Sequence, residues 1–573
     1  MRSILCFGQT DPAMQSIKPS SLIDFVYKPI ELVSDTLERK LGMASVVIIS
    51  LSAMLGSGLF VLPALAMLDM GGGAGSIPVG GIWLAYLVAA IIVLPGAVSK
   101  GELATAMPSS GGSYVYVERT FGPLIGTISG LGLWANFMLK SAFALIGFKA
   151  YLLVLESWLD VTIDIEIAAL LLLVIIVIIN ILGLKRIKKV QTPIVLTSVL
   201  FLFLLCFWAI FTMEMNWDAA FSREAYGAGW ASVAETAAFV FVAYAGVTKI
   251  AAVGGEIKDP SRNIPYGILL SLLISCLLYV VISIVMVATI EPSEFMIDGD
   301  HAREDPIYVF ATTVGGETIG VIAAVLAVTT MASMALAGIM ASSRFPFAMA
   351  RDNLLPEALE NVHSKYQTPH LAIIGTGIAL AAAIILIPVH DIAKLASGFK
   401  IMIFIVINAC VIVLRRASTT HSWYQPEWKS PLYPFFQLLG IFGGIVLIYL
   451  MGEKAIIGAA ACCILGLITY YSYGKSRAHP MLTPWRTVRT ELMNTDQFER
   501  EKRWLVFHTA AAKQSHPETL NESEFVHAMS IIAPKYDSFH VRNLFHEIDT
   551  NDDGVVDVDE FLEGIEDTLD EQE

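Results

Sequence analysis

Gly56, Ser57 and Gly58 interrupt an apolar run, residues 44–67, that is long enough to span a bilayer. A membrane helix keeps its backbone hydrogen bonds within itself because lipid offers no partner, so this step predicts local unwinding. Freed groups are tolerated only where they meet protein, water or a ligand. The helix that restarts after the break directs its positive N-terminal end here, so the N–H groups of Ser57 and Gly58 could bind a carboxylate. The sequence therefore predicts an anion site near the bilayer midplane, as a carrier of carboxylate-bearing solutes needs.

Two lysines within apolar runs are candidates for functional groups. Lys140 is about 15 residues from either end of the run 124–155, roughly 20 Å from water at 1.5 Å per residue. Its ammonium cannot reach the surface from there and must face a cavity, a partner or a proton path. We therefore expect Lys140 to be a functional group, the alternative being a lysine held by backbone carbonyls for stability alone. Lys249 is expected to pair with an acid or to act in gating or coupling.

A third set of residues lies in the stretch 549–560, DTNDDGVVDVDE. Oxygen-bearing residues stand at loop positions 1, 3, 5, 9 and 12, a carbonyl is available at position 7, and Gly554 occupies position 6, where the chain must turn sharply. This pattern resembles the EF-hand, which implies that the loop binds calcium. The implied ligands are Asp549, Asn551, Asp553, Val555, Asp557 and Glu560. The segment 513–524 has the same length without the ligands, and we interpret it as a degenerate partner loop.

Composition indicates what kind of chain positions these residues. The 573 residues have a mean hydropathy of +0.65, with 55% hydrophobic and only 16% charged residues, which excludes an ordinary soluble protein. The net charge of −15 and the lack of a basic arm predict no nucleic-acid partner. Twelve apolar runs of about 20 residues could span a lipid bilayer. They lie near 44–67, 81–107, 124–155, 164–184, 191–213, 231–255, 266–290, 317–343, 370–389, 391–414, 433–452 and 455–473.

Loop charges predict the orientation of these runs. Basic residues follow the even-numbered runs, and this basic side is expected to be cytoplasmic. They include Lys100, Arg119, Lys185, Arg186, Lys258, Arg351 and Arg415. Both termini of a multi-pass protein of the plasma membrane would then be cytoplasmic. The predicted parts are a cytoplasmic segment 1–40, a transmembrane part 41–475 and a cytoplasmic EF-hand-like part 476–573.

The sixth run repeats the feature of the first. Its centre is Ala243-Tyr244-Ala245-Gly246, and the two runs have opposite predicted orientations. Two interrupted segments five runs apart indicate two inverted five-helix repeats with a binding site between them. Close helix packing through small residues is the alternative for either cluster taken alone.

Four stretches resemble the amino acid–polyamine–organocation transporter superfamily, and the similarity covers roughly residues 36–475. They are GSGLF at 56–60, GELATAMPSSGGSYVYVERTFG at 101–122, EIKDPSRNIP at 256–265 and SSRFPFAMARDNLLP at 342–356. LKSAFALIGF in the third run and FVAYAGVTK in the sixth resemble the cationic amino acid transporter-like branch. The resemblance implies an all-α, LeuT-like fold of two inverted five-helix repeats plus two extra helices, alternating access, and an amino acid or amine substrate.

The resemblance also implies a substrate site. Its residues are Met54, Gly56, Ser57, Gly58, Lys140, Ser141, Val242, Tyr244 and Ala245. Carbonyls near Met54, Val242 and Ala245 would hold the α-ammonium, consistent with the attraction of carbonyl ends for cations. Tyr244 is either a gate or pocket wall or an aromatic packing residue.

Coupling is the point at which the sequence departs from this pattern. Many relatives carry a lysine about eight residues after a Val-Gln pair in the fifth run, but TPIVLTSVLFLF follows Val190-Gln191 here. Lys140 could replace that lysine, sodium could bind near the eighth-run hydroxyls, or the protein could exchange solutes. The eighth-run candidates are Thr329, Thr330 and Ser333.

The function expected is secondary amino acid transport, modulated by calcium on the tail. The alternatives are a membrane-anchored sensor that acts through a partner protein, and a carrier of polyamines, organic cations or metal ions. No catalytic constellation and no phosphate-binding loop indicates an enzyme or an ATP-driven pump. The resemblance favours cationic substrates whereas Lys140 favours neutral or acidic ones, and no oligomeric state is predicted.

Overall fold

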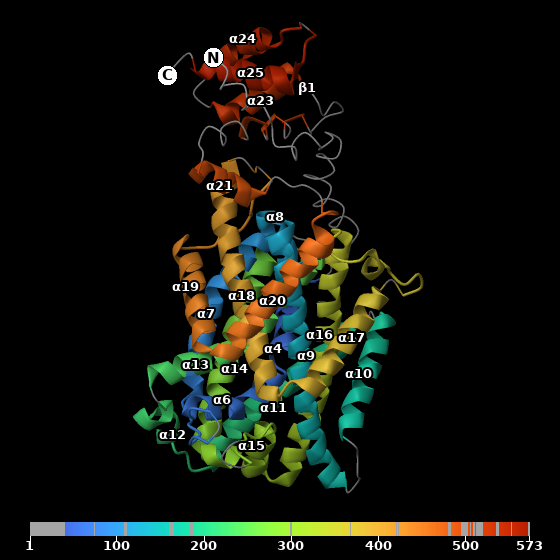
Figure 1. Ribbon diagram of the computed structural model, residues 1–573. Coiled ribbons are helices and arrows are strands. Elements are labelled where there is room, and N and C mark those ends of the chain that lie inside the picture. Colours follow the sequence, from blue (N-terminus) through green and yellow to red (C-terminus); the bar gives the residue numbers. More distant parts are fainter. Residues whose placement is uncertain are drawn as a thin grey trace.

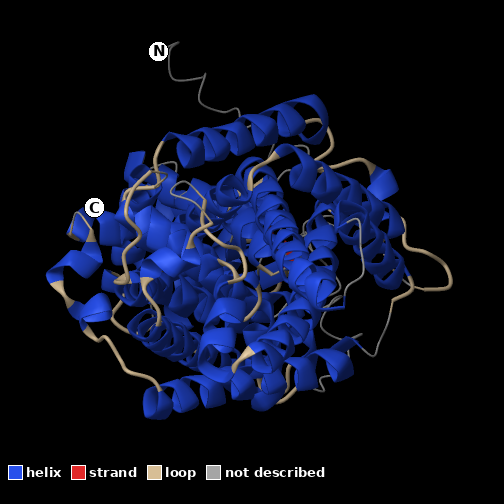
Figure 2. Cartoon of the chain, turned by 90° about the horizontal axis from the view of Figure 1, so that it is seen from below, coloured by secondary structure: helices blue, strands red, loops and turns tan. Residues whose placement is uncertain are grey.

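The computed structural model describes residues 41–570, apart from 74, 108–111, 160–164, 184–186, 228, 298–300, 367, 420, 422, 479–482, 494–501, 505, 508–509, 512–518, 534–537 and 552. The described chain is almost entirely helical, as the view from one end of the bundle shows (Figure 2). The longest helices run side by side, and a smaller helical unit lies beyond one end (Figure 1). The predicted segment 1–40 lies outside the described residues.

The described helices and strands follow one another along the chain. The first half contains α4 (Met43–Met54), α5 (Ser57–Phe60), α6 (Leu62–Gly71), α7 (Ile82–Ala106), α8 (Ser113–Phe121), α9 (Pro123–Leu159), α10 (Ile165–Ile181), α11 (Ile187–Thr212), α12 (Asp218–Phe221), η1 (Arg223–Tyr226), α13 (Trp230–Val240) and η2 (Phe241–Glu256). The second half of the bundle contains α14 (Pro260–Thr289), η3 (Pro292–Phe295), α15 (Pro306–Gly315), α16 (Glu317–Arg351), η4 (Glu357–Glu360), α17 (His370–Leu386), α18 (Val389–Arg416), η5 (Ala417–Thr419), α19 (Phe435–Leu450), α20 (Glu453–Thr469) and the π-helical η6 (Tyr470–Gly474). The remaining elements are α21 (Pro484–Met493), β1 (Thr519–Leu520), α23 (Glu522–Ile532), α24 (Ser538–Ile548), β2 (Val556–Asp557) and α25 (Val558–Asp570).

Eight helices within the described ranges are long and apolar enough to cross a membrane. They are α7, α9, α11, α13 with the start of η2, α14, α16, α18, and α20 with η6. Shorter apolar helices, among them α4, α6, α10, α17 and α19, coincide with other predicted runs. The chain is therefore a multi-pass helical membrane protein.

The first predicted run is interrupted where its glycines stand. Helix α4 ends at Met54, and Gly56 takes a non-helical conformation, with φ −113° and ψ −119°. The four-residue helix α5 follows, and a second irregular residue, Val61, separates it from α6. A residue without a Cβ adopts such a conformation at little cost, which explains why the break falls at Gly56.

The sixth predicted run changes its helix type near its middle. Helix α13 ends at Val240, and Phe241–Glu256 continues as the 3-10 helix η2. Such helices rarely exceed four residues because their hydrogen bonds are poorer, and a long one within a membrane segment indicates a functional hinge.

The C-terminal unit has its own apolar core. Strands β1 and β2 pair antiparallel, with Leu520 opposite Val556. Both residues stand at position 8 of the two predicted loops, so the degenerate and acidic loops lie together as paired loops would. Phe525 packs edge-on against Phe545 and Phe561 inside the core. Residues 513–518 of the degenerate loop lie outside the described part.

Helix α21 joins this unit to the bundle. It packs against α8, α18 and η5 at the bundle end that faces the C-terminal unit (Figure 1). Trp485 contacts the ring of Phe121 at 5.7 Å, and Val488 is buried among Phe121, Val413 and Ala417.

Candidate functional site

The two interrupted segments meet inside the bundle. A Cβ on Gly58 would lie 3.0 Å from the Cα of Ala243, and one on Gly246 would lie 2.7 Å from the carbonyl carbon of Ala53. Ser50 donates a hydrogen bond of 3.4 Å to the carbonyl of Gly246. The structure therefore brings together the two predicted breaks, which are almost 190 residues apart in the chain.

The predicted carboxylate donors lie at this meeting point. Among the residues that the structure describes, none accepts a hydrogen bond from the N–H of Ser57 or Gly58, whereas the N–H of Phe60 already bonds to the carbonyl of Gly56. Met334 of α16 covers the break, since its sulfur lies 3.8 Å from Ser57 Oγ and occupies the space that a Cβ on Gly56 would need. Methionine is flexible, so a ligand could displace this side chain.

The three predicted ammonium acceptors already have donors. Lys140 Nζ lies 3.2 Å from the carbonyl oxygen of Val242, and Lys400 Nζ lies 3.3 Å from that of Ala245. The carbonyl of Met54 accepts a hydrogen bond of 2.7 Å from the hydroxyl of Tyr279. In all three contacts a donor from the protein stands where the sequence analysis expected the α-ammonium of a substrate.

Tyr244 belongs to an aromatic brace around the break. Its hydroxyl donates to the carbonyl of Tyr86 at 2.9 Å, and the hydroxyl of Tyr86 donates to the carbonyl of Gly58 at 3.1 Å. The rings of Tyr244 and Tyr279 meet edge to face at 5.2 Å. Tyr244 is fully buried, so it stabilises the backbone at the break in this conformation.

A small cavity lies beside the break. Its volume is about 20 Å³, which is room for about one water molecule. It is lined by Ala53, Phe137, Lys140, Ser141, Gly246, Lys249, Met334, Ala337 and Gly338. The site is thus closed around the predicted residues Lys140, Ser141 and Lys249, and side chains must move before it can hold an amino acid.

Helix α18 contributes residues that the sequence did not indicate. Ser397 donates to the carbonyl of Phe239 at 2.7 Å and accepts from the N–H of Val242 at 3.0 Å, so it holds the junction of α13 and η2. Lys400 lies one turn further on and is completely buried. A lysine in the middle of the apolar run 391–414 was the signal that could have identified it.

The three hydroxyl residues of α16 that were candidates for binding sodium lie in different surroundings. Thr329 is exposed and bonds to carbonyls of its own helix, so it does not face a site. Thr330 is buried and lies 2.9 Å from the hydroxyl of Ser198, in the stretch of α11 where a coupling lysine was expected. Gln191 donates to the carbonyl of Ser333.

A larger cavity of about 1110 Å³ opens at the end of the bundle opposite α21. Asp69 of α6 lies 3.3 Å from His390 Nε2 and 3.2 Å from Lys394 Nζ, so an ionic cluster joins α6 to α18 beside this cavity. Glu304, in the loop before α15, also lines the cavity. Burial and the neighbouring charge of Asp305 raise the pKa of Glu304 to about 7, against the opposing effect of Lys149.

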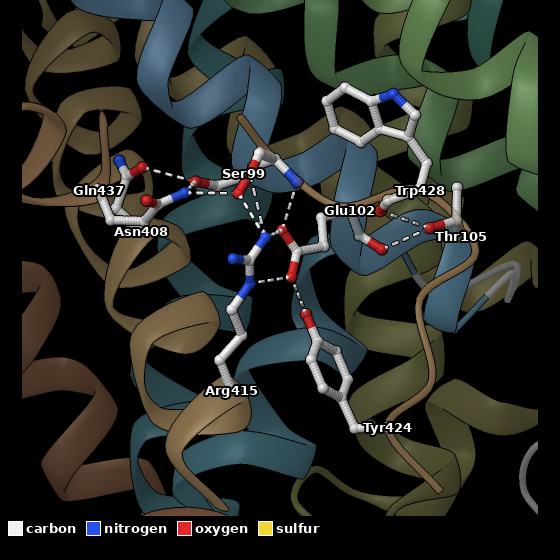
Figure 3. A network of polar contacts seen from close by, with 9 residues as sticks. Ser99, Glu102, Thr105, Asn408, Arg415, Tyr424, Trp428 and Gln437 are labelled. Atoms are coloured by element: carbon white, nitrogen blue, oxygen red, sulfur yellow. Dashed lines mark hydrogen bonds and ion pairs between the residues drawn. The ribbon is translucent and has the colours of Figure 1, made fainter. Parts of the chain in front are cut away.

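The opposite end is held by a buried carboxylate (Figure 3). Glu102 accepts two hydrogen bonds from Arg415, at 2.8 and 2.7 Å, and one from Tyr424. This network fixes α7 to α18 and to the loop before α19. Lys100, expected in a cytoplasmic connection, instead lies completely buried within α7, with its ammonium 5.2 Å from the ring centre of Phe404. That expectation was wrong because Lys100 falls inside the second run, 81–107, which forms α7 to Ala106, and not in the connection after it.

The acidic loop has the turn that its sequence requires. Gly554 adopts φ +82°, and its N–H donates to Asp549. Asp553 and Asp557 accept from backbone N–H groups two residues further on, and Glu560 accepts from Asp557. These oxygens are the hard ligands that calcium prefers. Within the described residues, however, no three acidic, histidine or cysteine side chains gather closely enough to hold a metal ion.

A helical membrane bundle built around two facing interrupted segments defines a membrane transport protein. Residues 41–470 match the amino acid permease family, and the chain belongs to that family, within the amino acid–polyamine–organocation superfamily. It is accordingly a transport protein and not an enzyme.

Relatives cover most of the chain. It is 28% identical to the branched-chain amino acid permease BcaP of Bacillus subtilis (strain 168), over 78% of this chain and 95% of that protein. It is 26% identical to the serine/threonine exchanger SteT of the same organism, over 77% and 98%. The vacuolar cationic amino acid transporter 4 of Arabidopsis thaliana is 25% identical, over 66% and 64%.

Proposed function

We propose that this protein is a secondary amino acid transporter that works by alternating access. The observation that carries the proposal is the contact between the break in α4–α5 and the 3-10 stretch η2. That contact is where a LeuT-like carrier, with twelve spans and two inverted repeats, places its substrate. The substrate carboxylate would bind at the N–H groups of Ser57 and Gly58, and its ammonium at the carbonyls of Met54, Val242 and Ala245.

Neutral amino acids are the substrates that this site supports best. The small cavity is lined by apolar residues, Ser141 and two lysines, and no carboxylate is among the described residues that line it. A cationic side chain would therefore meet Lys140 and Lys249 without a counter-charge there, which costs free energy at low dielectric. The names of the branched-chain and serine/threonine relatives agree with this proposal.

Orientation and regulation complete the proposal. The basic connections favour cytoplasmic termini in a plasma-membrane protein, and the tail would then sense internal calcium. The calcium ligands would be those of the loop 549–560, and the coupling ion is a proton or sodium unless the protein exchanges solutes. The EF-hand resemblance of this loop supports the calcium part of the proposal.

Proteoliposome uptake tests the proposal. Purified full-length protein should take up or counterflow at least one neutral amino acid, such as leucine, valine, serine or threonine, above protein-free liposomes. Arginine, spermidine and manganese serve as the comparison for the cationic alternatives. If none of these solutes is carried, the transporter proposal fails and the membrane sensor becomes the better description.

A further inference from the structure

Lys140 occupies a specific acceptor in the closed site. Its ammonium hydrogen-bonds to the carbonyl of Val242 just past the C-terminal end of α13. Val242 is the second residue of η2, and its carbonyl oxygen carries the partial negative charge of a peptide dipole, which attracts a cation. The side chain is 5% exposed and comes from α9, a different helix of the bundle.

The surroundings of Lys140 contain other cations. Lys249 of η2 is near enough to interact electrostatically with Lys140, and so is Lys400 of α18. In the described part of the chain no carboxylate pairs with Lys140, whose hydrogen bond to Val242 is its stabilising contact. The ammonium is therefore held by a carbonyl dipole, which a second cation can contest.

We propose that Lys140 is a specificity-determining residue whose ammonium holds the Val242 carbonyl while the carrier is empty and is displaced by the α-ammonium of the substrate. This inference rests on the proposed function, since it requires an amino acid at the break. A solute with an α-ammonium replaces one cation by another at the same oxygen. A carboxylate without an amine cannot make that exchange and leaves Lys140 in place.

Lys140→Met tests the inference because it keeps the length of the side chain and removes the competing cation. Binding is measured by isothermal titration on full-length protein in nanodiscs, with L-leucine and its des-amino counterpart 4-methylpentanoate as probes. Removing the competitor should tighten leucine binding about tenfold, or about 1.4 kcal/mol, and leave 4-methylpentanoate binding unchanged. The opposite result, equal weakening of both probes, would show that Lys140 pairs with the substrate carboxylate and would overturn the inference. Unchanged leucine binding would overturn it equally.

Two further variants serve as controls for the loss of the cation at position 140. Lys140→Arg keeps the cation, so leucine binding should stay near the wild-type value, and this variant decides the question if Lys140→Met does not fold. If Lys140→Met does not fold, the inference predicts that the leucine affinity of Lys140→Arg differs from the wild-type value by no more than about twofold. A tenfold change contradicts it. Lys149→Met on the same helix is the matched control and should leave both affinities unchanged. Absence of wild-type binding to leucine and to every other amino acid tested would instead count against the proposed function.

Discussion

At the scale of single residues, burial has its largest effect on the pKa of ionisable side chains. Glu304 lines the large cavity at the end of the bundle opposite α21, and desolvation together with Asp305 raises its pKa to about 7. An unfolded chain would ionise this carboxyl at its ordinary value of 4.5. The folded protein binds the proton more tightly than the unfolded chain, so its stability falls as the pH rises from about 4.5 to about 7.

Glu304→Gln should therefore be more stable than the wild type at pH 8, by about 1–2 kcal/mol after allowance for partial exposure. At pH 5 the two proteins should be nearly equally stable, because the wild-type carboxyl is then protonated when folded. Thermal unfolding followed by tryptophan fluorescence across this range measures the difference. Glu294→Gln, an exposed position in η3 of the same connection between α14 and α15, is the control. Equal stabilities of Glu304→Gln and wild type at pH 8 would contradict the raised pKa of Glu304.

At the scale of elements, the contact between the broken helices depends on the absence of a side chain. Gly246 of η2 leaves 2.8 Å between the position of a Cβ and the backbone nitrogen of Met54, so any larger residue forces two backbones apart. The close contact fixes where α4 ends relative to η2. It is also the point where either segment would have to move during alternating access.

Gly246→Ala should lower stability by about 1–3 kcal/mol and reduce uptake strongly, because the added methyl group overlaps backbone atoms of α4. Thermal unfolding and proteoliposome uptake measure both effects. Gly375→Ala in α17 is a matched control, since a Cβ there meets nothing within 4 Å. If Gly246→Ala transports as well as Gly375→Ala, the contact is not needed for function.

At the scale of the whole molecule, α21 precedes the C-terminal unit in the chain and packs against α8, α18 and η5 of the bundle. Trp485 and Val488 of α21 pack at the cytoplasmic end proposed for α18, while Ser397 and Lys400 of α18 contact the α13–η2 segment. Helix α18 therefore contacts both α21, which precedes the tail, and the segment that forms the proposed substrate site, so it is the element through which calcium on the tail would act on transport.

Glu560→Gln should abolish calcium binding to the tail and any effect of calcium on uptake, while uptake in the absence of calcium continues. Glu560 stands at the last ligand position of the loop, where calcium takes a bidentate carboxylate. Calcium titration of the full-length protein and uptake with internal calcium or a chelator provide the readouts. Glu563→Gln, one turn later and exposed, is the control. Wild-type protein that does not bind calcium would contradict the assigned loop.

The sequence by itself determined the features that depend on local chemistry. Lipid imposes long apolar helices, so hydropathy located the membrane segments, and the lack of a Cβ located the break at Gly56. The acidic loop and its turn at Gly554 could also be predicted from the sequence, because ligand spacing and positive φ are local properties.

Only the tertiary structure decided which groups face one another. Lys400, Ser397 and Met334 come from helices far along the chain and meet the breaks through packing, which no short-range pattern encodes. Lys100 was counted with the loop charges although it falls inside the run 81–107, and only packing showed that its side chain is buried within α7. The partners of the Val242 and Ala245 carbonyls were settled in the same way: the fold places lysines from α9 and α18 on oxygens that the sequence had assigned to a substrate.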